Sequence, residues 1–476
     1  MLQYTIKRLL LVIPTFFLIS LLIFVVLNVA PGRPGAGSQN DGGESSNQQQ
    51  KESFRIFKEQ FNLDKPILVN TRWALETADV RELLVTAHKL EGDVTAAERV
   101  DAEVDLDDFG NYLVKHLVVL LDDSNPEVQR LAAATLVSAA QLRFVSERRA
   151  DPLEARRVNR EISKANESVK TWTWPEGAPA EQQAAVSASW KDWYTTNEGN
   201  YTWTGSERVD AFFFDTRFAK YWSNLIHLDF GISTADRRPV FETVMGKLKY
   251  SLSLTMVATL LAYFIAVPIG VFSAYRQGTR LDTAVTVMLF VMYSLPTFFT
   301  GTVLLRLLTE GEPFAWFPTG DFQTMSSAPW TTWDRLKDIV WHLVLPMATY
   351  TSVSLATLSR YARAGVIEVI RADYIRTARA KGLSEPVVII KHAVRNGMIP
   401  ILTLLGGLLP ALIAGSVVIE VVFNIPGMGQ YIFNAIGARD YNAVMAVLLT
   451  SSFLALIGIL VSDLSYAFVD PRISFD

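Results

Sequence analysis

Long uncharged apolar runs alternate with charged segments along this chain. Six of them contain no charged side chain over at least twenty residues, long enough for a helix to cross a hydrocarbon core of about 30 Å. They are Leu9–Gly32, Tyr250–Tyr275, Thr283–Leu305, Ile339–Ser359, Asn396–Ile419 and Tyr441–Ser462. We therefore predict an all-α polytopic membrane protein with six transmembrane helices. Pro296 and Pro346 fall inside two of these runs and predict kinks there.

The charged segment between the fourth and fifth runs has a strong basic bias. Eight Lys and Arg residues lie between Arg360 and Arg395, against three acidic residues, so this short loop is expected in the cytoplasm. Within it, Asp373 and Lys381 suit the two ends of a short helix, and Gly382 can adopt the left-handed stop. Ser384 can cap a second helix that begins with Glu385 and Pro386.

The remaining charges agree with that orientation. Lys7 and Arg8 precede the first run, and Arg276 and Arg280 lie between the second and third, on the same side as the basic loop. Both termini are therefore expected in the cytoplasm and residues 33–249 outside it.

The long segment before the second run reads as a helical domain. Residues 35–51 are polar and glycine-rich, which is typical of a flexible tether. Residues 76–220 carry 26 acidic and 17 basic side chains, a net charge of −9. Apolar periodicity predicts helices at Phe109–Leu121, Glu127–Ala140, Leu153–Val169 and Glu181–Tyr194, the first two joined by a turn at Asp122–Pro126. That pair resembles one HEAT-type repeat, and five tryptophans after it are interpreted as core and docking surface.

The composition excludes several kinds of chemistry. There is no cysteine, and the five histidines show no metal-ligand spacing, so no metal site is predicted. No phosphate-binding GxxxxGK[ST] motif is present, because Gly246-Lys247 is followed by Leu248. We expect no catalytic residue, no bound cofactor and no nucleic-acid partner.

The basic loop carries a family resemblance. Its run YIRTARAKGLSE, followed by HAVRN and a proline, resembles the cytoplasmic coupling loop of dipeptide/oligopeptide-type ABC importer permeases. The first apolar run, Phe57–Leu75, Lys220–Ser233 and Glu420–Gly429 also resemble that family, although Arg33-Pro34 replaces its usual Asp-Pro or Gly-Pro. The C-terminal tail is similar to the microcin C and peptide branch.

The resemblance implies a permease subunit in a bacterial inner membrane that imports peptides or similar small solutes. It implies a second permease subunit, two ATPase subunits that bind ATP and magnesium, and an extracytoplasmic solute-binding protein as partners. The implied ATPase-coupling residues are Asp373, Tyr374, Thr377, Ala378, Arg379, Ala380, Lys381 and Gly382. The implied outer gate and translocation path comprise Glu420, Phe423, Asn424, Pro426, Gly427, Arg439 and Asp440.

The resulting domain plan has five parts. It assigns 1–34 to the first transmembrane helix, 35–75 to the tether and an outer segment, 76–219 to an inserted HEAT-like domain, 220–249 to a second outer segment, and 250–476 to the permease core with its coupling loop at 360–395. The ends of the insert are expected to lie close together.

Several alternatives remain open at this point. Glu420 could be an interfacial carboxylate that reaches toward water, and the small residues Gly407, Ala411 and Gly415 could pack within the chain or against the second permease subunit. An ion-coupled carrier or a membrane-anchored binding scaffold are the alternative functions. A carrier would call for charged residues at mid-membrane, and a scaffold would not need the coupling loop.

Overall fold

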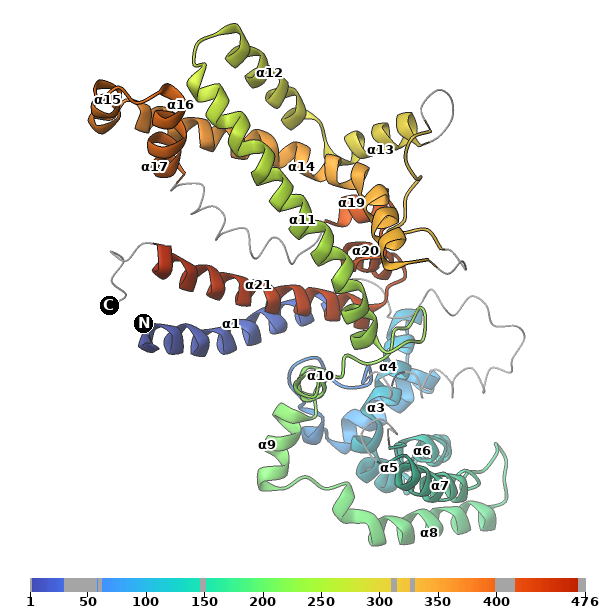
Figure 1. The fold of residues 1–476 in the computed structure, drawn as a ribbon. Coiled ribbons are helices and arrows are strands. Elements are labelled where there is room, and N and C mark those ends of the chain that lie inside the picture. The colour runs from blue at the N-terminus through green and yellow to red at the C-terminus, as the bar shows by residue number, and fades with distance from the viewer. Residues whose placement is uncertain are drawn as a thin grey trace. The chain divides into compact units, whose positions relative to one another are not determined.

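The computed structural model describes residues 2–29, 58, 62–145, 151–309, 315–325, 330–398 and 416–469 (Figure 1). These residues are predominantly helical and contain no β-strand, only an isolated bridge between Ile232 and Pro239. The chain divides into two compact units. We call residues Met1–Asp41 with Leu228–Asp476 the membrane unit, and Gly42–His227 the insert unit.

The membrane unit contains the apolar helices that the sequence predicts. Four described helices are long and apolar enough to cross a membrane, and a fifth span results if one bent pair counts as a single span. The four are α1 (Leu2–Val29), α11 (Val240–Tyr275), α14 (Thr332–Ile370) and α21 (Tyr441–Val469). The fifth predicted run, with its stripe of Gly407, Ala411 and Gly415, lies mostly outside the described residues.

The bent pair is the third predicted run. Helices α12 (Arg280–Ser294) and α13 (Thr297–Leu308) meet at Leu295-Pro296 with a bend of 98°. The break confirms the predicted kink there, because proline lacks the N–H that would continue the helix. Pro346, in contrast, lies inside the continuous helix α14.

Two further helix pairs complete the membrane unit. α1 packs on α21, where Phe16 and Phe453 meet edge to face with ring centroids 5.6 Å apart. Helices α11 and α14 cross through buried small residues, including Ala258, Ala262 and Ala266 of α11. Small side chains allow such helices to approach closely.

The shorter helices of the membrane unit are α15 (Asp373–Ala380), α16 (Glu385–Val387), the π-helix η5 (Val388–Val394), α17 (Arg395–Gly397), α19 (Val417–Val422) and α20 (Met428–Gly437).

The insert unit is a separate helical domain with its own core. Its helices are η2 (Arg72–Ala74), α3 (Thr77–His88), α4 (Ala96–Phe109), η3 (Gly110–Leu113), α5 (Val114–Leu120), α6 (Pro126–Ala139), α7 (Pro152–Val169), α8 (Ala180–Asn197), η4 (Glu198–Asn200), α9 (Gly205–Phe214) and α10 (Arg217–Ile226). Leu84, Leu113, Leu117, Leu136 and Trp190 are fully buried at its centre.

The helices predicted in the insert are found, with one difference. The predicted helix Phe109–Leu121 begins as the 3₁₀-helix η3 and continues as α5. Asn125 caps α6, and Pro126 occupies its first turn, which confirms the predicted elbow. The likeness to a HEAT repeat stays a prediction.

Burial confirms the core part of the interpretation of the tryptophans as core and docking surface. Trp190 is fully buried, Trp174 is nearly so, and Trp172 and Trp193 pack against the same core. Trp203 stacks on Tyr112 at a centroid distance of 4.3 Å. Four of the five indoles therefore belong to the core of the unit, and two of these, Trp190 and Trp193, are on α8.

The two ends of the insert lie side by side, as expected. The backbone N–H of Phe218 donates to Ile67 O at 3.2 Å, and that of Asn70 donates to Phe212 O at 3.0 Å. Asp215 accepts side-chain hydrogen bonds from Lys65 (2.9 Å) and Tyr112 (2.7 Å). The compact unit therefore includes residues on both sides of the predicted boundaries at 76 and 219.

Candidate functional site

The predicted coupling helix is present as α15, with the expected bounds. Asp373 is its first residue, Lys381 is its C-cap, and Gly382 follows with φ of +78°. An acidic first turn and a left-handed glycine after the last turn are favourable helix ends. The local sequence alone therefore accounts for this helix.

One face of α15 is anchored in the membrane unit. Ile375 is fully buried and Ala378 nearly so, in a cluster with Ala274 of α11 and Val366 of α14. The same cluster contains Val388 of η5. The short helix is thus joined by apolar contacts to the ends of two long helices.

The other face of α15 is available for a partner. Tyr374 is 44% exposed, and its hydroxyl accepts a hydrogen bond from Asn396 at 3.0 Å. The other predicted coupling residues on this side are also exposed: Asp373, Thr377, Arg379, Ala380, Lys381 and Gly382. The exposed face combines a phenol, cations and small residues within a helix of two turns.

The elbow after α15 is fixed by an ion pair. Arg379 binds Glu385 through both carboxylate oxygens, at 2.7 and 3.2 Å. The hydrogen bond from Arg379 holds the pKa of Glu385 below its usual range. Ser384 occupies the N-cap of α16, but its hydroxyl makes no capping hydrogen bond, so the predicted side-chain cap is wrong. The π-helix η5 that follows was not predicted.

The predicted gate residues form a second cluster around Glu420. Its carboxylate is fully buried and accepts hydrogen bonds from Ser251 Oγ at 2.7 Å and from the Gln430 backbone N–H at 3.0 Å. Ser251 Oγ in turn accepts from the Met428 N–H at 2.7 Å. Glu420 therefore joins α11, α19 and α20, and it matches neither a water-exposed nor an interfacial carboxylate. Its place in the translocation path stays a prediction.

The glycines of this segment are required by space. A Cβ on Gly427 would lie 2.4 Å from Glu420 Oε2, and a Cβ on Gly429 would lie 2.7 Å from the Cα of Val417. Real Cβ atoms do not approach other atoms so closely. Only glycine lets the backbone close over the buried carboxylate.

The other predicted gate residues hold the turns around this cluster. Phe423 is buried against α11 and α14, and its carbonyl accepts the Asp321 N–H at 2.9 Å. Asn424 has φ of +52° and accepts a hydrogen bond from Gln430 at 2.7 Å. Pro426, half-buried, precedes α20.

The last two predicted residues begin α21. Arg439 is exposed with φ of +54°, a turn that leads into Asp440. Asp440 is buried and accepts hydrogen bonds from Ser233 and from the Ala443 N–H. A carboxylate at a helix N-terminus is stabilised by free N–H groups and the helix dipole. Sequence reasoning missed Ser233, Ser251, Asp321 and Gln430 as partners.

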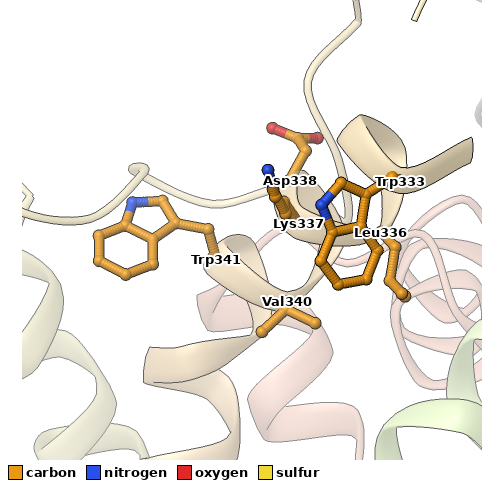
Figure 2. A pocket seen from close by; sticks show the side chains of 6 residues that line it. All are labelled: Trp333, Leu336, Lys337, Asp338, Val340 and Trp341. Atoms are coloured by element: carbon orange, nitrogen blue, oxygen red, sulfur yellow. The ribbon is translucent and has the colours of Figure 1, made fainter. Parts of the chain in front are cut away.

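A pocket on the first turns of α14 is a separate feature. Figure 2 shows its lining, with Trp333 and Trp341 on either side of Val340, and its volume is about 590 Å³. Lys337 lies 5.4 Å from the centre of the Trp333 ring. Tryptophans at the end of a membrane span are typical of the headgroup region.

No group of His, Asp or Glu among the described residues has the arrangement of a metal site.

Comparison with known proteins gives a family match for the C-terminal part of the chain. Residues 266–475 match the family described as "Binding-protein-dependent transport system inner membrane component". The chain is 37% identical over 260 residues to the oligopeptide transport system permease protein AppB of Bacillus subtilis (strain 168), covering 54% of this chain and 80% of that protein. The chain belongs to this family. It is an ABC-importer permease component and an integral inner-membrane protein, not itself an enzyme.

Two further relatives support the assignment. The dipeptide transport system permease protein DppB of Escherichia coli (strain K12) is 34% identical over 277 residues, with 54% of this chain and 80% of DppB covered. The peptidoglycan transport system permease protein YejB of Agrobacterium fabrum (strain C58 / ATCC 33970) is 32% identical over 262 residues, with 55% and 72% covered. The family match begins after the insert unit and includes α15 and Glu420, but it includes neither that unit nor Ser251 and Ser233.

Proposed function

We propose that this chain is one of two permease subunits in an ATP-driven importer of peptides or similar small solutes. The proposal rests on the structure of α15, which is a two-turn helix with a buried inner face and an exposed outer face. The names of its relatives refer to oligopeptides, dipeptides and peptidoglycan, which supports a peptide-like substrate.

In this proposal α15 inserts into a groove on a separate ATPase subunit that binds ATP and magnesium. The contact would use Tyr374, Thr377 and Ala380 on its exposed face. Because Ile375 and Ala378 fasten the helix to α11 and α14, a displacement of α15 would be transmitted to both long helices. Movement of whole helices would then open and close a path between the two permease subunits.

The orientation is part of the proposal. Basic residues near α15 and between α11 and α12 favour the cytoplasm for that side, so the insert unit would lie outside. Single cysteines can report this in a chain that has none. We expect an impermeant thiol reagent to label Thr196→Cys in intact cells and Gly382→Cys only after lysis. Labelling of residue 382 from outside would contradict the orientation.

We also infer that the insert unit is a docking face for the soluble solute-binding protein. Its net charge between residues 76 and 220 is −9, and the unit folds around its own core apart from the membrane helices. An acidic surface would steer a basic partner toward it and raise the association rate.

The experiment that tests the function is reconstituted transport. The chain, a second permease subunit and the ATPase subunits would be placed in vesicles with the binding protein and a labelled oligopeptide. We expect uptake that needs both ATP and the binding protein. Uptake driven instead by an ion gradient without ATP would favour the carrier, and binding without any uptake would favour the scaffold.

A further inference from the structure

Asp282 is a buried carboxylate that joins three elements of the membrane unit. It lies in the first turn of α12, where Ser273 of α11 and the Gly278 N–H donate hydrogen bonds to it. Arg363 of α14 binds both of its oxygens, with Nε to Oδ1 at 3.1 Å and a terminal guanidinium nitrogen to Oδ2 at 2.9 Å. The side chain of Asp282 is 7% exposed and that of Arg363 is 33% exposed.

The helices around this ion pair are in backbone contact. A Cβ on Gly270 of α11 would lie 2.5 Å from both Ala362 Cβ and Ser359 O of α14. On α14, a Cβ on Gly365 would lie 2.3 Å from Gly397 O of α17. Arg363 lies between these two glycine contacts. Within about two turns, α14 is therefore in close contact with α11 on one side of Arg363 in the sequence and with α17 on the other.

The ion pair also lies beside the base of the coupling helix. Ala274 follows Ser273 directly, and Val366 is one turn after Arg363; both belong to the apolar cluster that buries Ile375 of α15. We call α19, α20 and the turn between them the gate segment, after its predicted role. Toward the other end of α11, Ser251 donates a hydrogen bond to Glu420 of this segment. The 22 residues from Ser251 to Ser273 span roughly 33 Å of helix.

A bidentate pair between a guanidinium and a carboxylate fixes direction as well as distance. Apolar side chains at these positions could fill the same space, but they would allow the helices to rotate or slide against each other. Asp282 also receives hydrogen bonds from α11 and the turn, so the pair restrains α14 relative to the α11–α12 hairpin. With this geometry, a displacement of one helix is passed to the other without a change in their relative position.

We propose that Asp282 and Arg363 are positioning residues that make α14, α11 and the base of α15 move as one body. A displacement of α15 by an ATPase would then reach the Ser251–Glu420 contact through α11. The proposal rests on the proposed function insofar as the displacement comes from an ATPase.

The test uses two variants. Asp282→Asn keeps the shape of the side chain and removes its charge. Arg363→Lys keeps the positive charge and removes the bidentate contact to the carboxylate. The control is Ser294→Ala at the other end of α12, whose exposed hydroxyl donates to Val291 O of its own helix. In the reconstituted complex, we expect Asp282→Asn to lower the number of peptides imported per ATP at least about fivefold, the low end of usual coupling strengths. Arg363→Lys should lower it less, and the control should not change it.

A second readout does not depend on transport. Spin labels on Gln277→Cys, in the turn before α12, and on Arg371→Cys, just before α15, report whether these helices move as one body; both positions are exposed. With wild-type Asp282 we expect one narrow distance distribution that is the same without nucleotide and with ATP. With Asp282→Asn it should broaden or split.

The outcomes separate the two proposals. An unchanged peptide-to-ATP ratio or an unchanged distance distribution in Asp282→Asn would overturn the role of the ion pair. If the wild-type complex imports no peptide, the proposed function fails, and the label distances alone decide the role of the pair. If Asp282→Asn does not insert, Arg363→Lys decides both readouts.

Discussion

Ser251 and Glu420 are 169 residues apart in the chain, and their side chains share a buried hydrogen bond of 2.7 Å. The same serine oxygen accepts the N–H of Met428, so one hydroxyl connects the long helix α11 to both helices of the gate segment. A buried carboxylate is costly unless its oxygens are paired, which makes this contact the fixed point of the segment.

The first prediction concerns that contact. Ser251→Ala leaves the Met428 N–H without its acceptor and Glu420 without one donor, which should lower the free energy of local opening by about 1–3 kcal/mol. Ser253→Ala is the matched control, because its hydroxyl bonds only to Tyr250 O of its own helix. Hydrogen exchange of the amides of Met428 and Gln430 measures the difference. Equal exchange in both variants would show that Ser251 does not hold the gate segment.

The second prediction concerns Gly382. A Cβ there meets no atom within 4 Å outside the adjacent residues, so the main cost of Gly382→Val is backbone strain at φ of +78°, about 1–2 kcal/mol. We expect normal insertion but a sharp fall in transport and in substrate-stimulated ATP hydrolysis. Gly382→Asn should retain more activity, because asparagine tolerates the left-handed region.

The control for that experiment lies in the insert unit. Gly177 has φ of +76° and equally open space, so Gly177→Val carries the same strain away from α15. It should leave membrane insertion and binding of the ATPase subunits unchanged. Full stimulated ATPase activity in Gly382→Val would argue against a coupling role for this turn.

The third prediction concerns the junction of the insert unit. Burial alone would raise the pKa of Asp215, but the charge of Lys65 and the hydrogen bonds from Lys65 and Tyr112 outweigh it and hold that pKa below its usual range. The ionised carboxylate of Asp215 therefore stabilises the folded insert unit fully above the unfolded-state pKa of about 3.9. This stabilisation is lost as the pH falls through the lower pKa of the folded state. Burial lowers the pKa of Lys65, the partner of Asp215 in this pair.

Asp215→Asn tests this junction. It should lower the protection of the Asn70 and Phe218 amides by about 1–3 kcal/mol at pH 6–7, and the difference from wild type should shrink below about pH 4. Hydrogen exchange at matched pH values measures it. A difference that stayed constant down to pH 2 would mean that the charge of Asp215 does not contribute.

The fourth prediction concerns the insert itself. Because residues 63–70 bond to residues 212–218, a clean deletion must keep α9 and α10. We propose to replace residues 76–203 with a flexible Gly/Ser linker. The shortened chain should still insert and bind ATPase subunits, while its affinity for the solute-binding protein falls. Unchanged affinity would contradict the docking role and favour a cap that binds nothing, and loss of the ATPase would contradict the modular division.

The helix α15 could be predicted almost to the residue because its signals are local. Asp373, Lys381 and Gly382 determine its ends by charge and backbone conformation, independently of the rest of the chain. The apolar spans were predictable for a similar reason, and Pro296 marked the sharp break between α12 and α13. Ser384 shows the limit of such a signal, because the residue occupies the N-cap of α16 but its hydroxyl makes no capping hydrogen bond.

The environment of Glu420 could not be predicted, because its partners come from distant parts of the chain. Nothing near Glu420 in the sequence points to Ser251, and the same holds for Asp282 with Arg363. The tryptophans of the insert show a related limit. Their number is visible in the sequence, but whether an indole faces solvent or the core depends on how α8 packs on α5.

The central claim is that α15 is the contact for a separate ATPase, and co-purification tests it most directly. Ala380→Trp places a large side chain on the exposed face of α15 without disturbing Ile375 or Ala378, and Ala184→Trp makes the same change on an exposed position of α8. The account predicts that the tagged wild-type chain and Ala184→Trp retain the ATPase subunits in detergent, whereas Ala380→Trp inserts normally and loses them. Full retention of the ATPase by Ala380→Trp would contradict it.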